Sequence, residues 1–397
     1  MNLSRKALDI TESLTLSIDQ TAKQMKAEGL DVVGFGAGEP DFDTPCYIVK
    51  AANEALKKGL TKYTPVSGTI ELKNVIAAKL NRDNFVDYSI DEIIVSNGAK
   101  HTLHNVFQAI LNPGDEVIIL KPYWLSYPEL VKMAYGVPIF VDTDKEKGFN
   151  IVVSAIEKAI TPKTKAIIIN SPNNPTGAVY PEQTLREMAE LATEKGLYII
   201  SDEIYEKIIY GDQEHTCVAG LSQDIKNHTI TVNGLSKAYA MTGWRIGYAA
   251  GPRDVIKTMC NIQSHSTSNP NSIAQYASVA ALSMNSDFIS KMNTELNKRR
   301  LYMVNTVNSI DNLSCSIPCG AFYVMVNIRD IINKKHNGKI IDSSLTFAKE
   351  LLNAKMVTLV PGEAFGMEGF VRLSYAVAQE NIEKGLSRIE DFVGELK

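Results

Sequence analysis

The chain has 397 residues, of which 45% are hydrophobic and 22% charged, which is typical of a folded globular protein and excludes a disordered, collagen-like or coiled-coil chain. Its 41 Lys and Arg residues against 45 Asp and Glu residues give a net charge of −4, so no basic excess is available to neutralise a nucleic-acid backbone. No apolar run approaches the ~20 residues of a membrane-spanning helix, and the N-terminal residues lack the continuous apolar core of a signal peptide. We therefore expect a cytoplasmic protein that binds neither nucleic acid nor membrane.

The cysteines and histidines predict neither disulfides nor a metal site. The five cysteines are an odd number and are scattered along the chain, unlike a disulfide framework. Cys315 and Cys319 lie close together in the sequence, but no second Cys or His pair at zinc spacing accompanies them. No HExxH or GxSxG motif supports a zinc protease or serine hydrolase.

Short apolar runs alternate with helical patterns through the middle of the chain. A buried run of this kind is followed by a Gly, Asn, Ser or Pro turn and then by apolar residues at helical spacing. This alternation predicts a parallel sheet that is covered on both faces. The expected strands are 93–95, 117–120, 166–169, 197–200 and 229–232, and the clearest helices are about 99–111 and 181–195.

The end of the chain has a different pattern. It combines helical stretches at 281–310, 343–354 and 379–396 with two strands, at 321–326 and 370–374. We therefore predict an α/β protein with a large doubly wound, mainly parallel sheet domain and a smaller α+β domain. The expected limits are 1–45 for an N-terminal arm that joins the small domain, 46–280 for the large domain and 281–397 for the small domain.

Polar residues follow several of the expected strands, at the carboxyl edge where open α/β sheets bind ligands. Small residues at the start of the helix that begins near Gly98 let backbone N–H groups approach an anion, which the helix dipole also favours. The GxxxxGK[ST] phosphate loop is absent. A dinucleotide fingerprint starts at Gly34 and Gly36 but has Glu39 at its third glycine position, which disfavours an NAD-dependent oxidoreductase.

The segment from Ser236 to Gly247, SKAYAMTGWRIG, carries the most specific signal. It resembles the pyridoxal-phosphate (PLP) lysine motif of the class I aminotransferases, S-K-x(5)-G-x-R-x-G. Further motifs of that family agree in order and spacing over nearly the whole chain, and they lie at 38–42, 63–72, 121–124, 173–177, 201–205 and 370–374. The sequence is most similar to the bacterial-type (Ib) aspartate aminotransferase subgroup.

The resemblance implies a role for each matching residue around the PLP ring. Lys237 is expected to form the Schiff base with PLP and, once released, to carry the substrate proton. A cationic, partly desolvated site lowers the pKa of a lysine, which suits a base. Asp202 would pair with the pyridine nitrogen and keep the ring an electron sink. Asn174 and Tyr205 would donate hydrogen bonds to the phenolic oxygen of the ring, and Trp124 would stack on the ring.

The remaining implied roles concern the phosphate and the substrate. The phosphate would bind Arg245, Ser236 and the N–H groups of Gly98 and Ala99. The family often has a second hydroxyl at the position of Gly234, so one phosphate contact is missing here.

Arg372 would bind the substrate α-carboxylate with two parallel hydrogen bonds. Gly38 would let the substrate approach the backbone, and Trp124 and Asn174 would also contact it. Lys100 would either balance the charge of the phosphate or, as the resemblance implies, meet the side-chain carboxylate of a dicarboxylic substrate.

The resemblance also implies a homodimer with shared sites, because the tyrosine that matches Tyr63 reaches the phosphate of the neighbouring subunit. The expected reaction is ping-pong transfer of an amino group from an L-amino acid, foremost L-aspartate, to 2-oxoglutarate. An aromatic or prephenate-type preference, and another PLP reaction such as that of a β-lyase, remain alternatives. A non-catalytic regulator is disfavoured, because the lysine is present and no DNA-binding segment is added.

Overall fold

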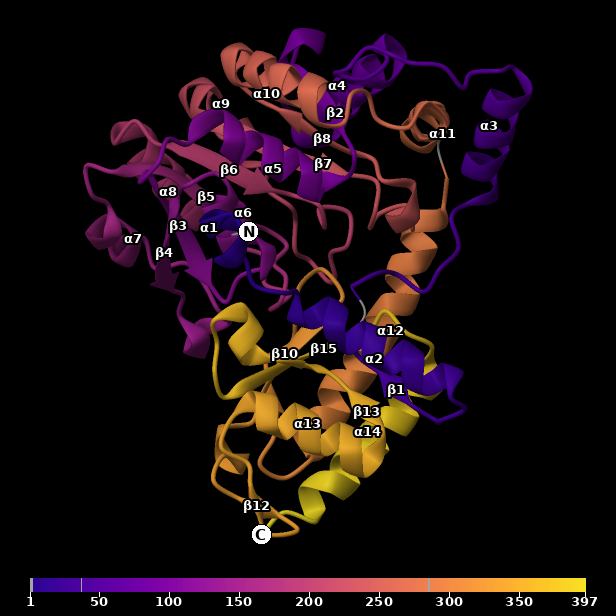
Figure 1. Ribbon diagram of the computed structural model, residues 1–397, viewed down its shortest axis with the longest axis vertical. Helices are drawn as coiled ribbons and strands as arrows, with labels where there is room; N and C mark the ends of the chain where they lie inside the picture. Colours follow the sequence, from indigo (N-terminus) through magenta and orange to yellow (C-terminus); the bar gives the residue numbers. More distant parts are fainter. Residues whose placement is uncertain (1–2, 37, 285) are drawn as a thin grey trace.

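The computed structural model describes residues 3–36, 38–284 and 286–397. A seven-stranded sheet forms the centre of the large domain, in the upper half of Figure 1, with the strand order β2-β8-β7-β6-β5-β3-β4. All neighbouring strands are parallel except β8, which is antiparallel to both β2 and β7. The strands are β2 (Ile93–Ser96), β3 (Glu116–Lys121), β4 (Val137–Asp142), β5 (Thr164–Asn170), β6 (Tyr198–Asp202), β7 (Thr229–Gly234) and β8 (Gly247–Ala250).

The sheet is buried on both faces, as its continuous apolar strands predict. In β5, Ile167 and Ile169 belong to one apolar cluster while Ala166 and Ile168 belong to another, because successive side chains point to opposite faces. The surrounding helices of this domain are α3 (Cys46–Lys57), α4 (Ile70–Asn84), α5 (Ala99–Ile110), α6 (Ser126–Met133), α7 (Val153–Ala159), α8 (Glu182–Glu194), α9 (Gln223–His228), α10 (Arg253–Ser266) and α11 (Ser272–Ser283).

The direction of β8 agrees with its connection to β7, which contains no crossover helix. A return to a parallel strand needs a crossover of a dozen or more residues, usually an α-helix. Residues 235–246 contain only the single 3-10 turn Thr242–Trp244 between the two strands. The chain therefore turns back and runs antiparallel, and this turn carries the segment with Lys237 and Arg245.

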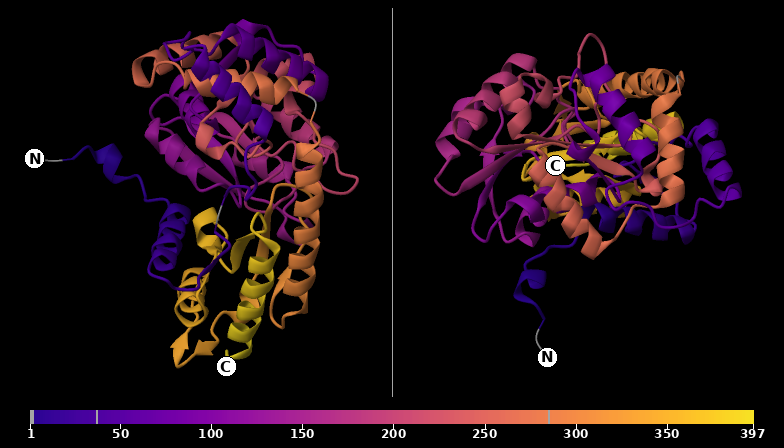
Figure 2. Two further views of the ribbon diagram at one scale, coloured as in Figure 1. Left: turned by 90° about the vertical axis from the view of Figure 1, so that its right-hand side faces the viewer. Right: turned by 90° about the horizontal axis from the view of Figure 1, so that it is seen from above.

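The small domain, in the lower half of Figure 1, is built on a four-stranded antiparallel sheet of order β14-β15-β10-β9. The long helix α12 runs from the large domain down along the small one (Figures 1 and 2). The elements are α12 (Phe288–Ser309), β9 (Ser314–Cys315), β10 (Tyr323–Asn327), β11 (Lys335–His336), β12 (Lys339–Ile340), α13 (Ser344–Lys355), β13 (Val357–Thr358), β14 (Val360–Pro361), β15 (Phe370–Ser374) and α14 (Gln379–Gly394).

The N-terminal arm spans both domains. Helix α2 (Leu14–Ala27) contacts the small-domain strands β13 and β14, and β1 (Val33–Gly34) pairs in parallel with β13. Helix α1 (Arg5–Leu8) stands out from the body of the chain in Figure 2 and contacts α6 of the large domain. None of the helices in the described ranges is long and apolar enough to cross a membrane.

The secondary structure differs from the expectation at one domain limit. Helix α11 continues to Ser283, beyond the expected limit at residue 280, and its Ala281 and Leu282 belong to a large-domain apolar cluster. The helical stretch expected at 281–310 is therefore the end of α11 followed by the separate helix α12, which begins at Phe288.

Candidate active site

A cavity of about 420 Å³ lies at the carboxyl ends of β5, β6 and β7, with walls from both domains and from the N-terminal arm. Every residue that the sequence analysis assigned to the site lines this cavity, except Gly98 and Tyr63. The residues brought together are Gly38, Ala99, Lys100, Trp124, Asn174, Asp202, Tyr205, Ser236, Lys237, Arg245 and Arg372.

The cavity carries an excess of positive charge. Its basic residues are Lys23, Lys100, Lys237, Arg245 and Arg372, whereas its acidic residues are Glu39 and Asp202. Clustered cations that are partly removed from water are expected to meet anions. The cavity is therefore suited to a ligand, or a pair of ligands, with several negative charges.

Lys237 lies in the turn after β7, and its ammonium group donates a hydrogen bond to the carbonyl oxygen of Gly38. Burial lowers the pKa of Lys237 from 10.5 to about 8, and the positive charges of Arg245 and Arg372 act in the same direction. Glu39 and Asp202 oppose the shift. The amine is thus far easier to deprotonate near neutral pH than an exposed lysine, as a nucleophile or base requires.

Asp202 ends β6 and is 4% exposed. Its Oδ2 accepts a hydrogen bond from the Tyr127 hydroxyl at 2.7 Å, and its Oδ1 accepts one from the Ile204 N–H at 3.3 Å. The pKa of Asp202 is raised to about 6, because burial above all, and the neighbouring charge of Glu203, outweigh the two hydrogen bonds and Lys237, which lower it.

Arg372, in the middle of β15, is a buried cation whose partners are all neutral. Its Nη1 donates to Asn174 Oδ1 at 3.0 Å and its Nη2 to the Gly36 carbonyl oxygen at 2.8 Å, while its Nε is buried without a partner. Among the residues that the structure describes, none of the carboxylates forms an ion pair with it. The guanidinium instead lies 4.4 Å from the ring centroid of Tyr323. A buried arginine without a counter-ion is costly, so this site is prepared for an anionic ligand.

The start of α5 is shaped around Arg245. Gly98 has a φ of +88°, and a Cβ there would lie 2.4 Å from Arg245 Nη2, so only glycine allows the guanidinium to approach this turn. The Gly98 N–H donates to the Ser96 carbonyl oxygen at 2.8 Å. The expected contact of the Gly98 N–H with the phosphate stays a prediction. Gly98 provides space for Arg245, and Ala99 is the residue of this pair that faces the cavity.

The glycine at position 234 also has a steric reason. A Cβ at Gly234 would lie 2.8 Å from the Ile246 carbonyl oxygen and 3.1 Å from Gly247 Cα. The hydroxyl residue that the family often has at this position therefore does not fit this backbone without a shift. Ser236, two residues on, lines the cavity and is the hydroxyl available there.

Lys100 and Trp124 lie together on one wall. The Lys100 ammonium is 5.0 Å from the centroid of the Trp124 ring, within the range of a cation–π contact. Desolvation in the cavity and then the charge of Arg245 lower the pKa of Lys100.

Tyr63 lies outside the cavity of this chain. Its side chain is 92% exposed, which is unusual for a tyrosine, and it does not line the pocket. The expected contact of Tyr63 with a neighbouring subunit therefore stays a prediction.

Several cavity residues were not found from the sequence. Tyr323 in β10 shares a hydrogen bond of 2.9 Å with the Tyr205 hydroxyl, and Asn170 at the end of β5 accepts the Asn174 N–H at 2.7 Å. Lys23 in α2 and Tyr127 in the first turn of α6 also line the cavity. The position of Asn170 at a strand end was a usable signal, whereas the others contact the cavity only through tertiary packing.

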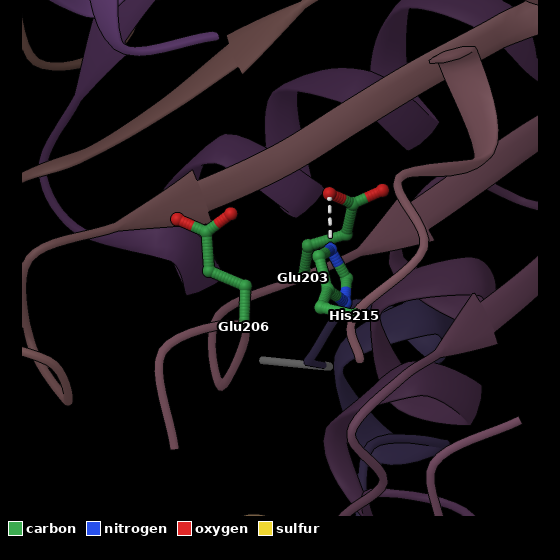
Figure 3. Close-up of side chains that lie close together, drawn as sticks. All are labelled: Glu203, Glu206 and His215. Carbon is green, nitrogen blue, oxygen red and sulfur yellow. Dashed lines mark hydrogen bonds and ion pairs between the residues drawn. The ribbon is translucent and has the colours of Figure 1, made fainter. Parts of the chain in front are cut away.

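A second group of titratable side chains lies next to the cavity, where Glu203, Glu206 and His215 approach one another (Figure 3). Their ligand atoms already bind protein groups. His215 Nε2 is 3.0 Å from Glu203 Oε2, and the Lys79 ammonium and the Asn84 amide contact Glu206. Because Lys79 and Asn84 contact the two carboxylate oxygens of Glu206, and His215 pairs with Glu203, we assign these residues to a buried ion-pair network.

Comparisons with known proteins identify the class to which this fold and site belong. The family described as aminotransferase class I and II matches residues 30–389. The chain belongs to this family, whose members depend on PLP. The resemblance found in the sequence, the fold class and the cofactor are thereby confirmed.

Individual relatives match over the full chain. It is 46% identical to an aspartate aminotransferase of Geobacillus stearothermophilus, covering 99% of each chain. It is 45% identical to a probable aspartate/prephenate aminotransferase of Rhizobium leguminosarum, covering 98% of each. The crystal structure of the aspartate aminotransferase of Rhizobium meliloti superposes with a TM-score of 0.96 at 42% identity, covering all of both chains.

The described residues fit PLP on structural grounds of their own. The cavity combines an excess of cations, a lysine with a lowered pKa, a buried carboxylate and a buried guanidinium nitrogen without a partner. The cations are complementary to the phosphate of PLP, the lysine to its aldehyde, and the buried carboxylate to its pyridine nitrogen.

Proposed function

We propose that this aminotransferase moves the amino group of L-aspartate to 2-oxoglutarate in a ping-pong reaction. The observation that carries the proposal is Arg372, a buried guanidinium without a carboxylate partner in the described structure, which shares one cavity with Lys237 and Lys100. An α-carboxylate and a side-chain carboxylate are the anions that a dicarboxylic amino acid adds to a PLP phosphate. The names of the similar proteins from Geobacillus and Rhizobium meliloti support aspartate as the donor.

The residues that would hold the cofactor are Lys237, Asp202, Asn174, Tyr205, Trp124, Ser236, Arg245 and Ala99. Bound PLP supplies an electron sink for the negative charge that develops at the substrate Cα. Asp202, as a carboxylate, would keep the pyridine nitrogen protonated. Arg245, with Gly98 leaving room for its guanidinium, would neutralise the phosphate.

The chain's own residues then orient the substrate and move its proton. Arg372 would bind the α-carboxylate through a fork of N–H donors, which fixes the position of Cα. Lys237 Nζ would take the proton from Cα, for which its pKa of about 8 is suited, since a base works best when its pKa lies near the operating pH. Lys100 would bind the side-chain carboxylate.

A screen of amino donors against several 2-oxo acids tests this function. We expect the highest kcat/KM with aspartate and glutamate as donors and 2-oxoglutarate as acceptor. Product formed from the donor without any oxo acid would instead indicate a β-lyase or a related reaction. A preference for prephenate as the acceptor would support the activity named for the Rhizobium leguminosarum relative.

We also propose a cytoplasmic homodimer with shared sites. The exposed Tyr63 side chain supports this assembly, because the family resemblance assigns it to the phosphate of a neighbouring subunit and its own cavity does not use it. Sedimentation of the PLP-loaded protein tests the dimer, and a fully active monomer would overturn it.

A further inference from the structure

Tyr127 makes a buried hydrogen bond that the proposed function does not yet use. It lies in the first turn of α6, its side chain is 3% exposed, and its hydroxyl is 2.7 Å from Asp202 Oδ2. The phenol is the donor, because burial and the adjacent carboxylate raise the pKa of Tyr127 well above its usual value. This is a charge-assisted hydrogen bond between two buried side chains.

Tyr127 also contacts the aromatic residue expected to stack on the cofactor. Its ring meets the Trp124 ring edge to face, with 5.3 Å between centroids and an interplanar angle of 82°. Tyr127 thus contacts both Trp124, which is assigned to the face of the PLP ring, and Asp202, which is assigned to its nitrogen. The other oxygen of Asp202 has only a longer contact, 3.3 Å from the Ile204 N–H.

The charged state of Asp202 depends on opposing influences. Burial and the negative charge of Glu203 favour the neutral acid, and they outweigh the opposing influences, so that the pKa of Asp202 is raised to about 6. The Tyr127 hydroxyl is the first of the influences that favour the carboxylate, ahead of the Ile204 N–H and Lys237. Loss of this donor therefore moves Asp202 toward the neutral form, which cannot stabilise a protonated pyridine.

We infer that Tyr127 is a positioning residue for transamination, which holds Asp202 as a carboxylate directed at the pyridine nitrogen of PLP. The inference rests on the proposed function and on the assignment of Asp202 to that nitrogen. If Tyr127 had only a structural role, its hydroxyl would need a hydrogen-bond partner, but its loss would not change the protonation of the cofactor.

The test reads the protonation of the cofactor as well as the rate. The Tyr127→Phe protein is loaded with PLP that carries 15N at the ring nitrogen, and its NMR shift is compared with that of the original protein at neutral pH. We expect the 15N signal to move toward that of unprotonated pyridine. We also expect kcat with aspartate to fall by about tenfold or more while KM changes little, because a buried charged acceptor loses a donor.

Tyr88→Phe is the matched control, because Tyr88 is also a buried tyrosine of the large domain but does not line the cavity. We expect it to leave the 15N signal and kcat unchanged. If Tyr127→Phe does not fold, 3-fluorotyrosine at position 127 keeps the ring and the hydroxyl and makes the hydroxyl a stronger donor. The pH at which the 15N signal passes to that of the unprotonated nitrogen is then expected to rise.

An unchanged 15N signal in the Tyr127→Phe protein, or an unchanged pH dependence of that signal with 3-fluorotyrosine at position 127, overturns the inference. This outcome is distinct from failure of the proposed function. If the original protein binds PLP but transfers no amino group from any donor, the proposed function fails, and the 15N comparison still decides whether Tyr127 controls the pyridine nitrogen.

Discussion

Replacement of Lys100 by serine tests which residue sets the preference for a dicarboxylic donor. The Lys100 ammonium lies 5.0 Å from the centroid of the Trp124 ring at the cavity wall and is exposed enough to meet a ligand. Loss of a charge-assisted hydrogen bond to the donor's side-chain carboxylate costs ~1.5–3 kcal/mol, a loss of roughly 10- to 150-fold in kcat/KM. The exposure of Lys100 favours the lower end of this range.

The same substitution also removes the contact with Trp124, which affects all donors. An exposed cation–π contact contributes about 0.5–1 kcal/mol, equivalent to a factor of roughly two to five. We therefore expect kcat/KM for aspartate and glutamate to fall at least several times more than kcat/KM for phenylalanine or alanine.

The assay measures kcat/KM for these donors with one fixed acceptor. Lys100→Arg is the control, because it keeps the positive charge, and it should retain most of the preference for aspartate. Equal losses for charged and uncharged donors would refute the reasoning and indicate that Lys100 serves the phosphate or the fold.

Four further predictions concern the other cavity residues and the assembly. Lys237→Ala should lose turnover, and borohydride should no longer attach PLP covalently to this residue. Full activity in this variant would reject the assignment of Lys237 as the Schiff-base lysine. Because the pKa of Lys237 is lowered to about 8, the fraction of free amine increases as the pH rises through that value. The rate at which the cofactor-free protein binds PLP should therefore be half-maximal near pH 8. A rate that rises only near pH 10.5, the ordinary value, would contradict this environment. Arg372→Lys should lower kcat/KM by roughly 10- to 150-fold for every amino donor alike, because it removes the forked contact to the α-carboxylate that all donors share; a loss confined to dicarboxylic donors would contradict that role. Tyr63→Phe should weaken PLP retention in equilibrium dialysis without abolishing turnover, and unchanged retention would argue against the intersubunit contact.

The sequence predicted the large domain well, because its signal is local. The strands around Ile167 and Ile199 are continuous apolar runs, and such runs alternate with helices only in sheets that are covered on both faces. The expected polar residues at the strand ends meet in one cavity because the carboxyl ends of parallel strands share an edge. The antiparallel β8 was not predicted, because strand direction depends on the path of the connection.

The part of the site that the sequence could not show is made by contacts between distant segments. Tyr127 and Asp202 are 75 residues apart, and Arg372 and Asn174 are 198 apart, so nothing in the local pattern of either residue predicts the pairing. The space that Gly98 leaves for the guanidinium of Arg245 is likewise a contact between distant segments.

The sequence by itself thus determined the family and the cofactor, and it predicted the residues with the chemistry for it, because these depend on residue type and on spacing along the chain. The tertiary structure alone decided the charged states of those residues. Whether Lys237 is a free amine, or Asp202 a carboxylate, depends on how much water burial removes and on which donors and charges face each group. Those quantities arise only when the two domains and the N-terminal arm close around the cavity.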